Sequence, residues 1–287
     1  MSAVIRKELK QYFSTMYGYV FVGMLLLITG IITTITNLIN GYSGFEYSLY
    51  TVSYIFLLIV PILTMSSLSE EKKSRTDQLL YSLPLSTKDI ILGKFFAMAG
   101  VLALPTLIMC VYPLILSVFG NVNFLTAYCA IFGFYIMGCA LLAFGIFVSG
   151  MTGSPVIAAV ISFFSLLLMF LLGDLSTMIP QDAFTSLCCF ALLCALIALL
   201  LYYVTKNETV SVALFVVLLA VDVLIYAFKS ELLENTFPKM LSALCVYDRY
   251  ESFAAGIFDL TAIVYYLSFI CVFLFLAAQS FEKRRWN

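Results

Sequence analysis

The sequence contains no histidine among its 287 residues, and this absence excludes several kinds of site at once. The commonest general base of enzymes, His-ligated zinc and His-ligated haem all require that residue. The phosphate-binding pattern G-x-x-x-x-G-K-[ST] is missing too, because Gly93-Lys94 stands alone at the start of an apolar run. We therefore expect no ATP binding by that route and no histidine-based catalysis.

Metal-binding cysteine patterns are also absent, although the chain has eight cysteines. No CxxC pair or other metal-ligand spacing occurs, and Cys245 alone lies outside a clear apolar run. A cysteine in an apolar run behaves as a small hydrophobic residue. We interpret the remaining seven as packing residues: Cys110, Cys129, Cys139, Cys188, Cys189, Cys194 and Cys271.

Charged residues are scarce at 11%, whereas 63% of the chain is hydrophobic and its mean hydropathy is +1.08. Soluble domains are about 25% charged and about 45–50% apolar. Both deviations indicate an all-α polytopic membrane protein. The first apolar run is too long for a cleavable signal and no small-residue cleavage site follows it, so we interpret it as an uncleaved span.

Apolar runs long enough to cross a bilayer predict a single transmembrane domain, residues 1–287, with about eight transmembrane helices. Pro105 and Pro113 should kink or break the third of them. Residues 1–16 mix apolar and basic side chains and suit an interfacial helix on the inner leaflet. The predicted spans are 17–39, 51–68, 91–119, 125–149, 154–173, 183–203, 209–228 and 259–281.

The distribution of basic residues predicts the orientation. With both termini in the cytoplasm, twelve of the fifteen Lys and Arg residues lie on the cytoplasmic side, and only Lys229, Lys239 and Arg249 lie opposite. An aromatic belt is expected on the outer side, formed by Tyr42, Phe45, Tyr47 and Tyr50. In the fourth span, small residues predict close helix packing within the chain: Gly133, Gly138, Ala140 and Gly145.

A polar island at residues 69–78 interrupts this apolar chain and continues into a leucine-rich stretch, so that residues 69–90 form a cytoplasmic loop. Leucines near helical spacing predict a short amphipathic helix that begins at Ser74 or Thr76 and ends at Pro84. Such a helix fits a groove on a soluble partner. The alternative is a solvated loop whose lysines only fix the topology. Ser86-Thr87-Lys88-Asp89 should cap the third span.

The loop resembles that of type-2 ABC exporter permeases. The resemblance lies in residues 70–86, from Glu70-Glu71 to Leu83-Pro84-Leu85-Ser86, and in Ile91-Leu92-Gly93-Lys94-Phe95. A second block, residues 249–260 with the ending Glu282-Lys283-Arg284-Arg285-Trp286, resembles the gliding-motility (GldF-like) branch. The likeness covers residues 1–173 and 245–287.

The resemblance implies a fold with a six-helix core, so the extra apolar runs read as a two-helix insertion at 180–230. It also implies short extracytoplasmic helices within 231–258. Arg75 departs from the family pattern, which usually has Gly at that position. The residues that correspond to the family's ATPase-coupling loop are Glu70, Glu71, Arg75, Thr76, Asp77, Leu79, Leu80, Leu83 and Pro84.

The resemblance further implies a permease subunit of an ABC exporter in the bacterial plasma membrane. Such a subunit has no catalytic residue, cofactor or metal of its own, because ATP and Mg belong to a separate ABC ATPase. Expected partners are that ATPase, a second permease copy or homologue, the lipid bilayer and an extracytoplasmic membrane-anchored subunit. Nucleic acid is not expected, because the basic residues are few and juxtamembrane.

Asp222 is the ionisable residue inside the seventh predicted span, and a carboxylate at that depth suggests a functional role. It also lies in the outer part of the span, where it would reach headgroups or Tyr226. An ATP-independent channel or secondary carrier that uses Asp222 is the alternative function. An intramembrane enzyme finds no support, because the spans hold no carboxylate pair, Ser/Lys pair or metal cluster.

Overall fold

The computed structural model describes residues 1–74, 86–205, 214–220, 222–223, 226 and 234–285, and these are helices joined by short connections, without strands. They form two compact units, one of residues 1–168 with 246–287 and the other of residues 169–245. The helices are α1 (Ser2–Ser14), α2 (Met16–Thr33), η1 (Thr34–Ile39), α3 (Phe45–Ser53), α4 (Phe56–Thr64), α5 (Ser69–Lys73), α7 (Thr87–Met109), α8 (Tyr112–Leu116), α9 (Phe124–Met151), α10 (Pro155–Met178), α11 (Ala183–Thr205), α14 (Thr236–Leu244), α15 (Asp248–Ala254) and α16 (Leu260–Arg285).

Within the described residues, five helices are long and apolar enough to cross a membrane, or six when one bent pair counts as a span. The five are Met16–Ile39, Thr87–Leu116, Phe124–Met151, Pro155–Met178 and Leu260–Lys283. The sixth predicted span lies in α11, whose described apolar stretch is the shorter Ala183–Ala195. Most of the seventh falls outside the described residues, so the number eight stays a prediction.

The second predicted span, 51–68, begins too late, and the helix bends within it. The chain is helical from Phe45, and the segments Phe45–Ser53 and Phe56–Lys73 meet at 55°. At the bend, Leu57 and Leu58 donate backbone hydrogen bonds three residues back, to Tyr54 and Ile55, instead of four. Pro61 also removes the donor that the carbonyl of Leu57 would use in a regular helix, which weakens this part of the ladder.

The α-helix of the third predicted span is interrupted at one of its two prolines, although Thr87–Leu116 as a whole still counts as one span. Pro105 lies inside α7, whereas Pro113 lies in the first turn of α8. A regular helix would pair the carbonyl of Met109 with the N–H of residue 113, and proline has none. The α-helix accordingly ends at Met109, and the next turn tightens, with Val111 bonded to Ile108.

The core of the first unit surrounds α9, which contacts α16, α15, α7, α4 and α3. Glycines allow these neighbours to approach closely. A Cβ atom on Gly133 would lie 2.5 Å from Phe253, one on Gly138 would lie 2.6 Å from Leu102, and one on Gly145 would overlap Thr64. The prediction that small residues of this span pack within the chain is confirmed at these three positions.

The expected aromatic belt is wrong for one member. Phe45 is fully buried and stacks on Tyr112 of α8 at 5.5 Å, whereas Tyr42 and Tyr47 are exposed. Next to this contact, Asn37 of η1 is buried and donates to the carbonyls of Tyr42 and Gly44. These bonds fix the chain between η1 and α3 and turn Phe45 inward.

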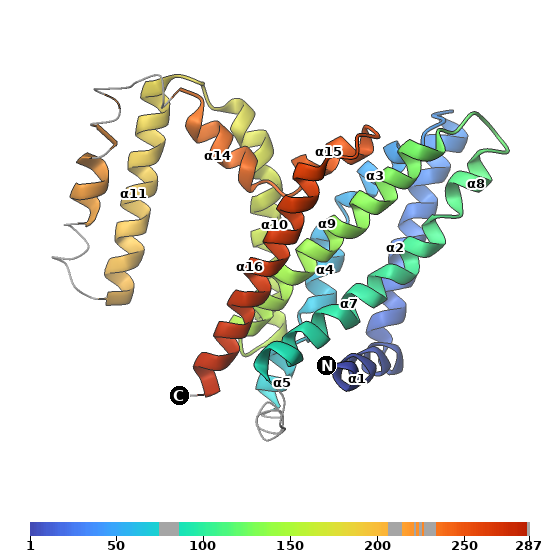
Figure 1. Ribbon diagram of the computed structural model, residues 1–287, viewed down its shortest axis with the longest axis horizontal. Helices are drawn as coiled ribbons and strands as arrows, with labels where there is room; N and C mark the ends of the chain where they lie inside the picture. The colour runs from blue at the N-terminus through green and yellow to red at the C-terminus, as the bar shows by residue number, and fades with distance from the viewer. Residues whose placement is uncertain (75–85, 206–213, 221, 224–225, 227–233, 286–287) are drawn as a thin grey trace. The chain divides into compact units, whose positions relative to one another are not determined.

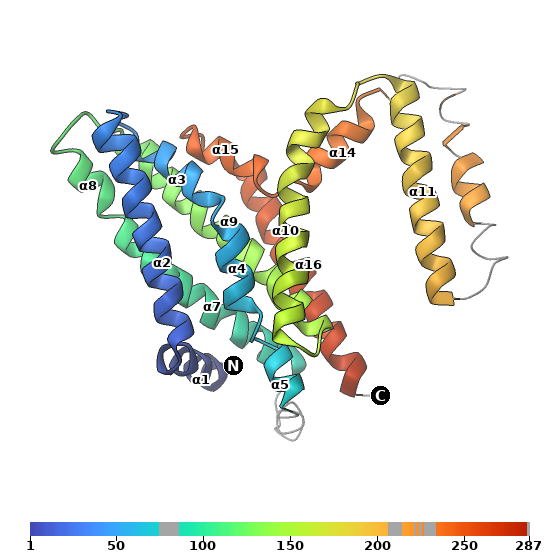
Figure 2. The same ribbon diagram turned by 180° about the vertical axis from the view of Figure 1, so that it is seen from behind.

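The helix α1 lies across the end of the first unit (Figure 1). It contacts α7 and α2, and α5 lies at this same end in both views (Figure 2). In the second unit, α11 contacts α14, and Phe190 meets Phe237 edge-to-face at 5.2 Å. Cys245 is buried there, with its Sγ 3.9 Å from the carbonyl of Phe170.

Candidate functional site

The short helix α5 precedes the predicted docking loop and is held by the end of α9. The buried Ser149 hydroxyl accepts hydrogen bonds from the backbone N–H groups of Leu68 and Ser69, at 3.1 Å each. It also donates to the carbonyl of Met65 at 3.2 Å. One side chain of α9 thereby satisfies backbone groups on both sides of the turn that leads from α4 into α5.

A second connection joins α5 to α9 through Lys72. This lysine is buried, and its Nζ donates to the carbonyl of Gly150. The Ser280 hydroxyl of α16 donates to the same carbonyl at 3.3 Å. The last turn of α9, α5 and α16 therefore meet at one backbone oxygen, and a buried ammonium requires such an acceptor.

Lys94 forms the centre of the site. It lies in α7, eight residues after the N-cap residue Ser86, and its side chain is 2% exposed. The Nζ atom lies 2.9 Å from Oε1 of Glu71 and 3.1 Å from Oε1 of Glu8, and it donates to the carbonyl of Ser67 at 2.8 Å. A buried ammonium has three protons, and here each has an oxygen acceptor.

The two carboxylates come from different helices. Glu8 lies on the buried row of α1 and its side chain is 5% exposed, whereas Glu71 on α5 is 14% exposed. Lys7 lies 3.6 Å from both of them and is 56% exposed, so two carboxylates face two ammonium groups. We call Glu8, Glu71, Lys94 and Lys7 the anchor cluster.

Close packing of α1 on α7 encloses the anchor cluster. A Cβ atom on Gly93 would lie 2.8 Å from Val4, so glycine is required for α1 to approach at this position. Tyr12 is buried on the same row of α1 as Glu8, and burial, followed by the negative charge of Glu8 and Glu71, raises the pKa of its phenol far above the usual range. The Gly93-Lys94 pair thus combines a close contact between α1 and α7 at Gly93 with a buried charge at Lys94.

The far end of the loop is a helix start with a side-chain cap. The N–H of Asp89 donates to the Ser86 hydroxyl at 3.2 Å, and that hydroxyl donates to the Asp89 carboxylate at 2.6 Å. Ser86 is therefore the N-cap residue of α7, and the predicted cap is confirmed. Residues 71 and 94, on either side of the loop, are joined through the anchor cluster.

The predicted coupling residues divide into two groups. Glu71 belongs to the anchor cluster, and Glu70 is exposed in the first turn of α5. The other predicted residues lie outside the described residues, so their helix stays a prediction: Arg75, Thr76, Asp77, Leu79, Leu80, Leu83 and Pro84.

Sequence reasoning missed Glu8, Lys94 and Ser149. A signal for the first was present, because Val4, Glu8 and Tyr12 recur every four residues and share one face of a helix. A lysine inside an apolar run, as Lys94 is, also indicates a buried partner. Ser149 carried no such signal, because its role depends on a turn 80 residues earlier in the chain.

Asp222 lies in the second unit and is not part of the anchor cluster. Its Oδ2 lies 3.6 Å from the Sγ of Cys194, a buried residue of α11. The structure thus places a thiol beside this carboxylate, and the expected contact with headgroups or Tyr226 stays a prediction. No group of three acidic or cysteine side chains among the described residues could hold a metal ion.

Residues 2–228 match the model of a family described as ABC-2 family transporter protein. The match begins in α1, includes the whole anchor cluster and continues past α11. No curated protein matches the chain.

Proposed function

Because the chain belongs to the ABC-2 family of transporter proteins, we propose that it is the permease subunit of an ABC transporter driven by a separate ATPase subunit. It is a multi-pass membrane protein with several apolar helices of spanning length. ATP and Mg would bind the partner, and this chain would receive the motion. The anchor cluster is the observation that supports the proposal most directly.

The cluster gives a route by which force on the loop would reach the membrane helices. Glu71 lies at the start of the 69–90 loop and Lys94 follows the loop, and their charged groups lie 2.9 Å apart. A partner that displaced the loop would therefore move α5 and α7 together. Because Glu8 contacts the same ammonium, α1 would move with them.

The leucines of the predicted docking helix would make the contact with the ATPase. In the proposed complex, Leu79 and Leu83 enter a groove of the ATPase and exclude water there. An aspartate at either position would bury an unpaired carboxylate, which costs about 1–3 kcal/mol or more. That cost lowers the affinity of the complex about fivefold to 150-fold.

Co-purification tests this contact. The full chain is expressed with the ABC ATPase subunit proposed as its partner, and Leu79→Asp and Leu83→Asp are compared with Ser74→Asp. The control adds the same charge at an exposed position of the same loop without removing an apolar side chain. We expect the leucine variants to lose the ATPase and the control to retain it. Retention of the ATPase and of transport by both leucine variants would contradict the assignment.

We further propose the bacterial plasma membrane as location, export as direction and two permease subunits per transporter, identical or homologous. An extracytoplasmic membrane-anchored subunit is the proposed outer partner. The similarity of the loop and of the 249–260 block to exporter permeases supports these proposals. The first unit also has α1 and the end of α16 at the same end, which agrees with both termini in the cytoplasm (Figure 1). Reporter fusions at each terminus test the orientation, and an extracytoplasmic signal from either would refute it.

A further inference from the structure

Only one face of α1 contributes to the anchor cluster. Val4, Glu8 and Tyr12 are buried against the rest of the unit. The next row, Ile5, Leu9 and Phe13, is only half-buried, and beyond it lies an exposed row formed by Ser2, Arg6 and Lys10. These rows follow from the helical repeat, which places residues four apart on one face.

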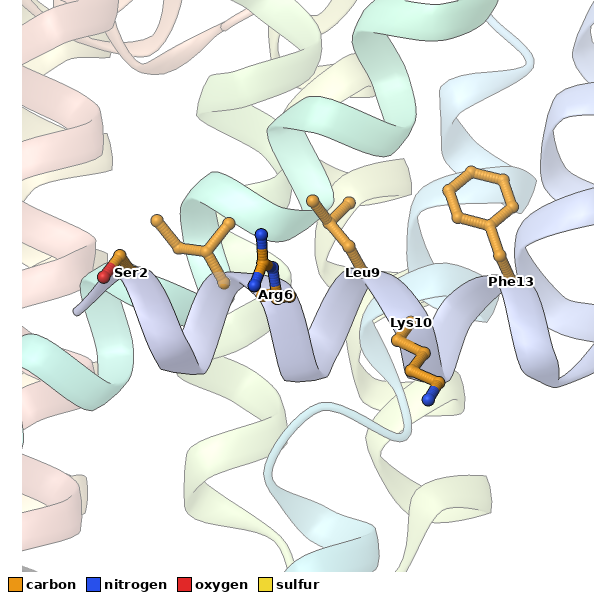
Figure 3. A pocket seen from close by; sticks show the side chains of 6 residues that line it. Ser2, Arg6, Leu9, Lys10 and Phe13 are labelled. Carbon is orange, nitrogen blue, oxygen red and sulfur yellow. The ribbon is translucent and has the colours of Figure 1, made fainter.

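The two outer rows enclose a shallow cavity of about 460 Å³, whose lining residues are Ser2, Ile5, Arg6, Leu9, Lys10 and Phe13. Leu9 and Phe13 point to the same side of α1, whereas Lys10 points away from them (Figure 3). The cavity therefore has an apolar wall and a cationic edge. Its volume lies within the range of small-molecule sites, roughly 300–1,000 Å³.

The cationic edge has no neutralising partner among the described residues. The ion pairs there involve Lys7 and Lys94, and neither Arg6 nor Lys10 has a carboxylate within ion-pair distance. The only acidic residue of α1, Glu8, is already used by Lys94 on the opposite side. This face is consequently positively charged and complementary to an anion.

The apolar wall of the cavity adjoins α2, which is part of the span Met16–Ile39. Phe13 meets Tyr19 of α2 edge-to-face at 5.5 Å, and the Tyr19 side chain is exposed. Because α2 begins two residues after α1 ends, α1 lies at the depth where that span leaves the hydrocarbon. An occupant of the cavity must therefore offer hydrocarbon to Leu9 and Phe13 and a negative charge to Arg6 and Lys10.

We propose that this face of α1 binds an anionic phospholipid of the adjoining leaflet. The headgroup phosphate lies between Arg6 and Lys10, which are one helical turn apart, and an acyl chain lies along Ile5, Leu9 and Phe13. Basic residues beside apolar ones on a surface helix are the usual arrangement for anionic leaflets. The site exists whether or not the chain is driven by an ATPase.

Photocrosslinking tests the site in the full-length protein. The chain is reconstituted in phosphatidylcholine vesicles that contain a minority of phosphatidylglycerol, with Tyr19 replaced by p-benzoylphenylalanine. Mass spectrometry of the crosslinked lipid gives its enrichment in phosphatidylglycerol over the bulk bilayer. Arg6→Gln and Lys10→Gln are compared with Lys88→Gln, which removes the same charge from an exposed position in the first turn of α7.

We expect the enrichment to fall about fivefold for Arg6→Gln or Lys10→Gln, and to vanish in the double variant. Crosslinks to phosphatidylcholine should persist, which shows that the helix still meets the membrane. Lys88→Gln should leave the enrichment unchanged, and added inorganic phosphate should not compete. An equal loss with Lys88→Gln, an enrichment that survives in the double variant, competition by phosphate, or the absence of any lipid crosslink would each overturn the proposal.

Discussion

Replacement of Lys94 by methionine should be among the most damaging single substitutions in the chain. Methionine fills a similar volume but leaves Glu8 and Glu71 with one half-exposed ammonium, that of Lys7, at 3.6 Å. Removal of one partner from a buried ion pair costs about 3–5 kcal/mol, because the remaining charge stays desolvated. For a chain of this size we expect the midpoint of thermal unfolding to fall by about 6–20 °C.

Thermal unfolding of the purified protein in one detergent measures this effect, with Lys88→Met as the matched control. Lys88 is an exposed lysine in the first turn of α7, so its replacement should change stability by less than about 0.5 kcal/mol. The double variant Lys94→Met with Glu8→Gln restores a balance of charge between Lys7 and Glu71. It should therefore be more stable than Lys94→Met alone, which is the non-additivity expected of residues in contact.

Equal midpoints for Lys94→Met and Lys88→Met would refute the reasoning, because they would show that the cluster is solvated. A double variant whose losses simply add would also refute it. In that case Glu8 and Lys94 would not interact in the folded protein.

Three further predictions concern packing, capping and pH. Gly145→Val should destabilise the protein by about 1–3 kcal/mol by overpacking, whereas Gly23→Val, in open space, should have little effect in the same unfolding assay. Ser149→Ala leaves two buried N–H groups without an acceptor and should cost about 1–3 kcal/mol, against no measurable change for the exposed Ser117→Ala. The pKa of Asp259 is lowered by hydrogen bonds from Thr261, so its stabilising contribution is present above the unfolded pKa and is lost as the pH falls through the lower folded value. An Asp259→Asn variant should show a weaker loss of stability below about pH 4, and an unchanged acid dependence would contradict this.

The fold class and the approximate positions of several spans could be predicted, because length and hydropathy determine which segments enter a bilayer. Pro113 predicted the end of α7 for a local reason, because proline has no N–H to donate to the carbonyl of Met109. The bend between α3 and α4 carried a weaker signal. There the chain turns at Tyr54 and Ile55, and no proline or glycine occupies either position.

The site was predicted in part. The cap at Ser86 is a local feature and is confirmed. The charge density near Glu71 is local too, but the coupling role inferred from it stays a prediction. The connection of Glu71 to Lys94 and Glu8 is a tertiary contact between residues 23 and 86 positions apart. Periodicity identifies which face of a helix is buried but not which other face it meets, so the partners of a buried charge follow only from the packed structure.

The three glycine contacts of α9 limit how the bundle can change shape. About 78% of the spanning window of α9 is buried, compared with 17% for α10, 22% for α16 and 28% for α2. A helix with neighbours at van der Waals distance at three levels has no free volume in which to rotate or slide. In mechanical terms α9 is the most constrained of the described helices. The sparsely covered helices are the ones whose movement breaks few contacts.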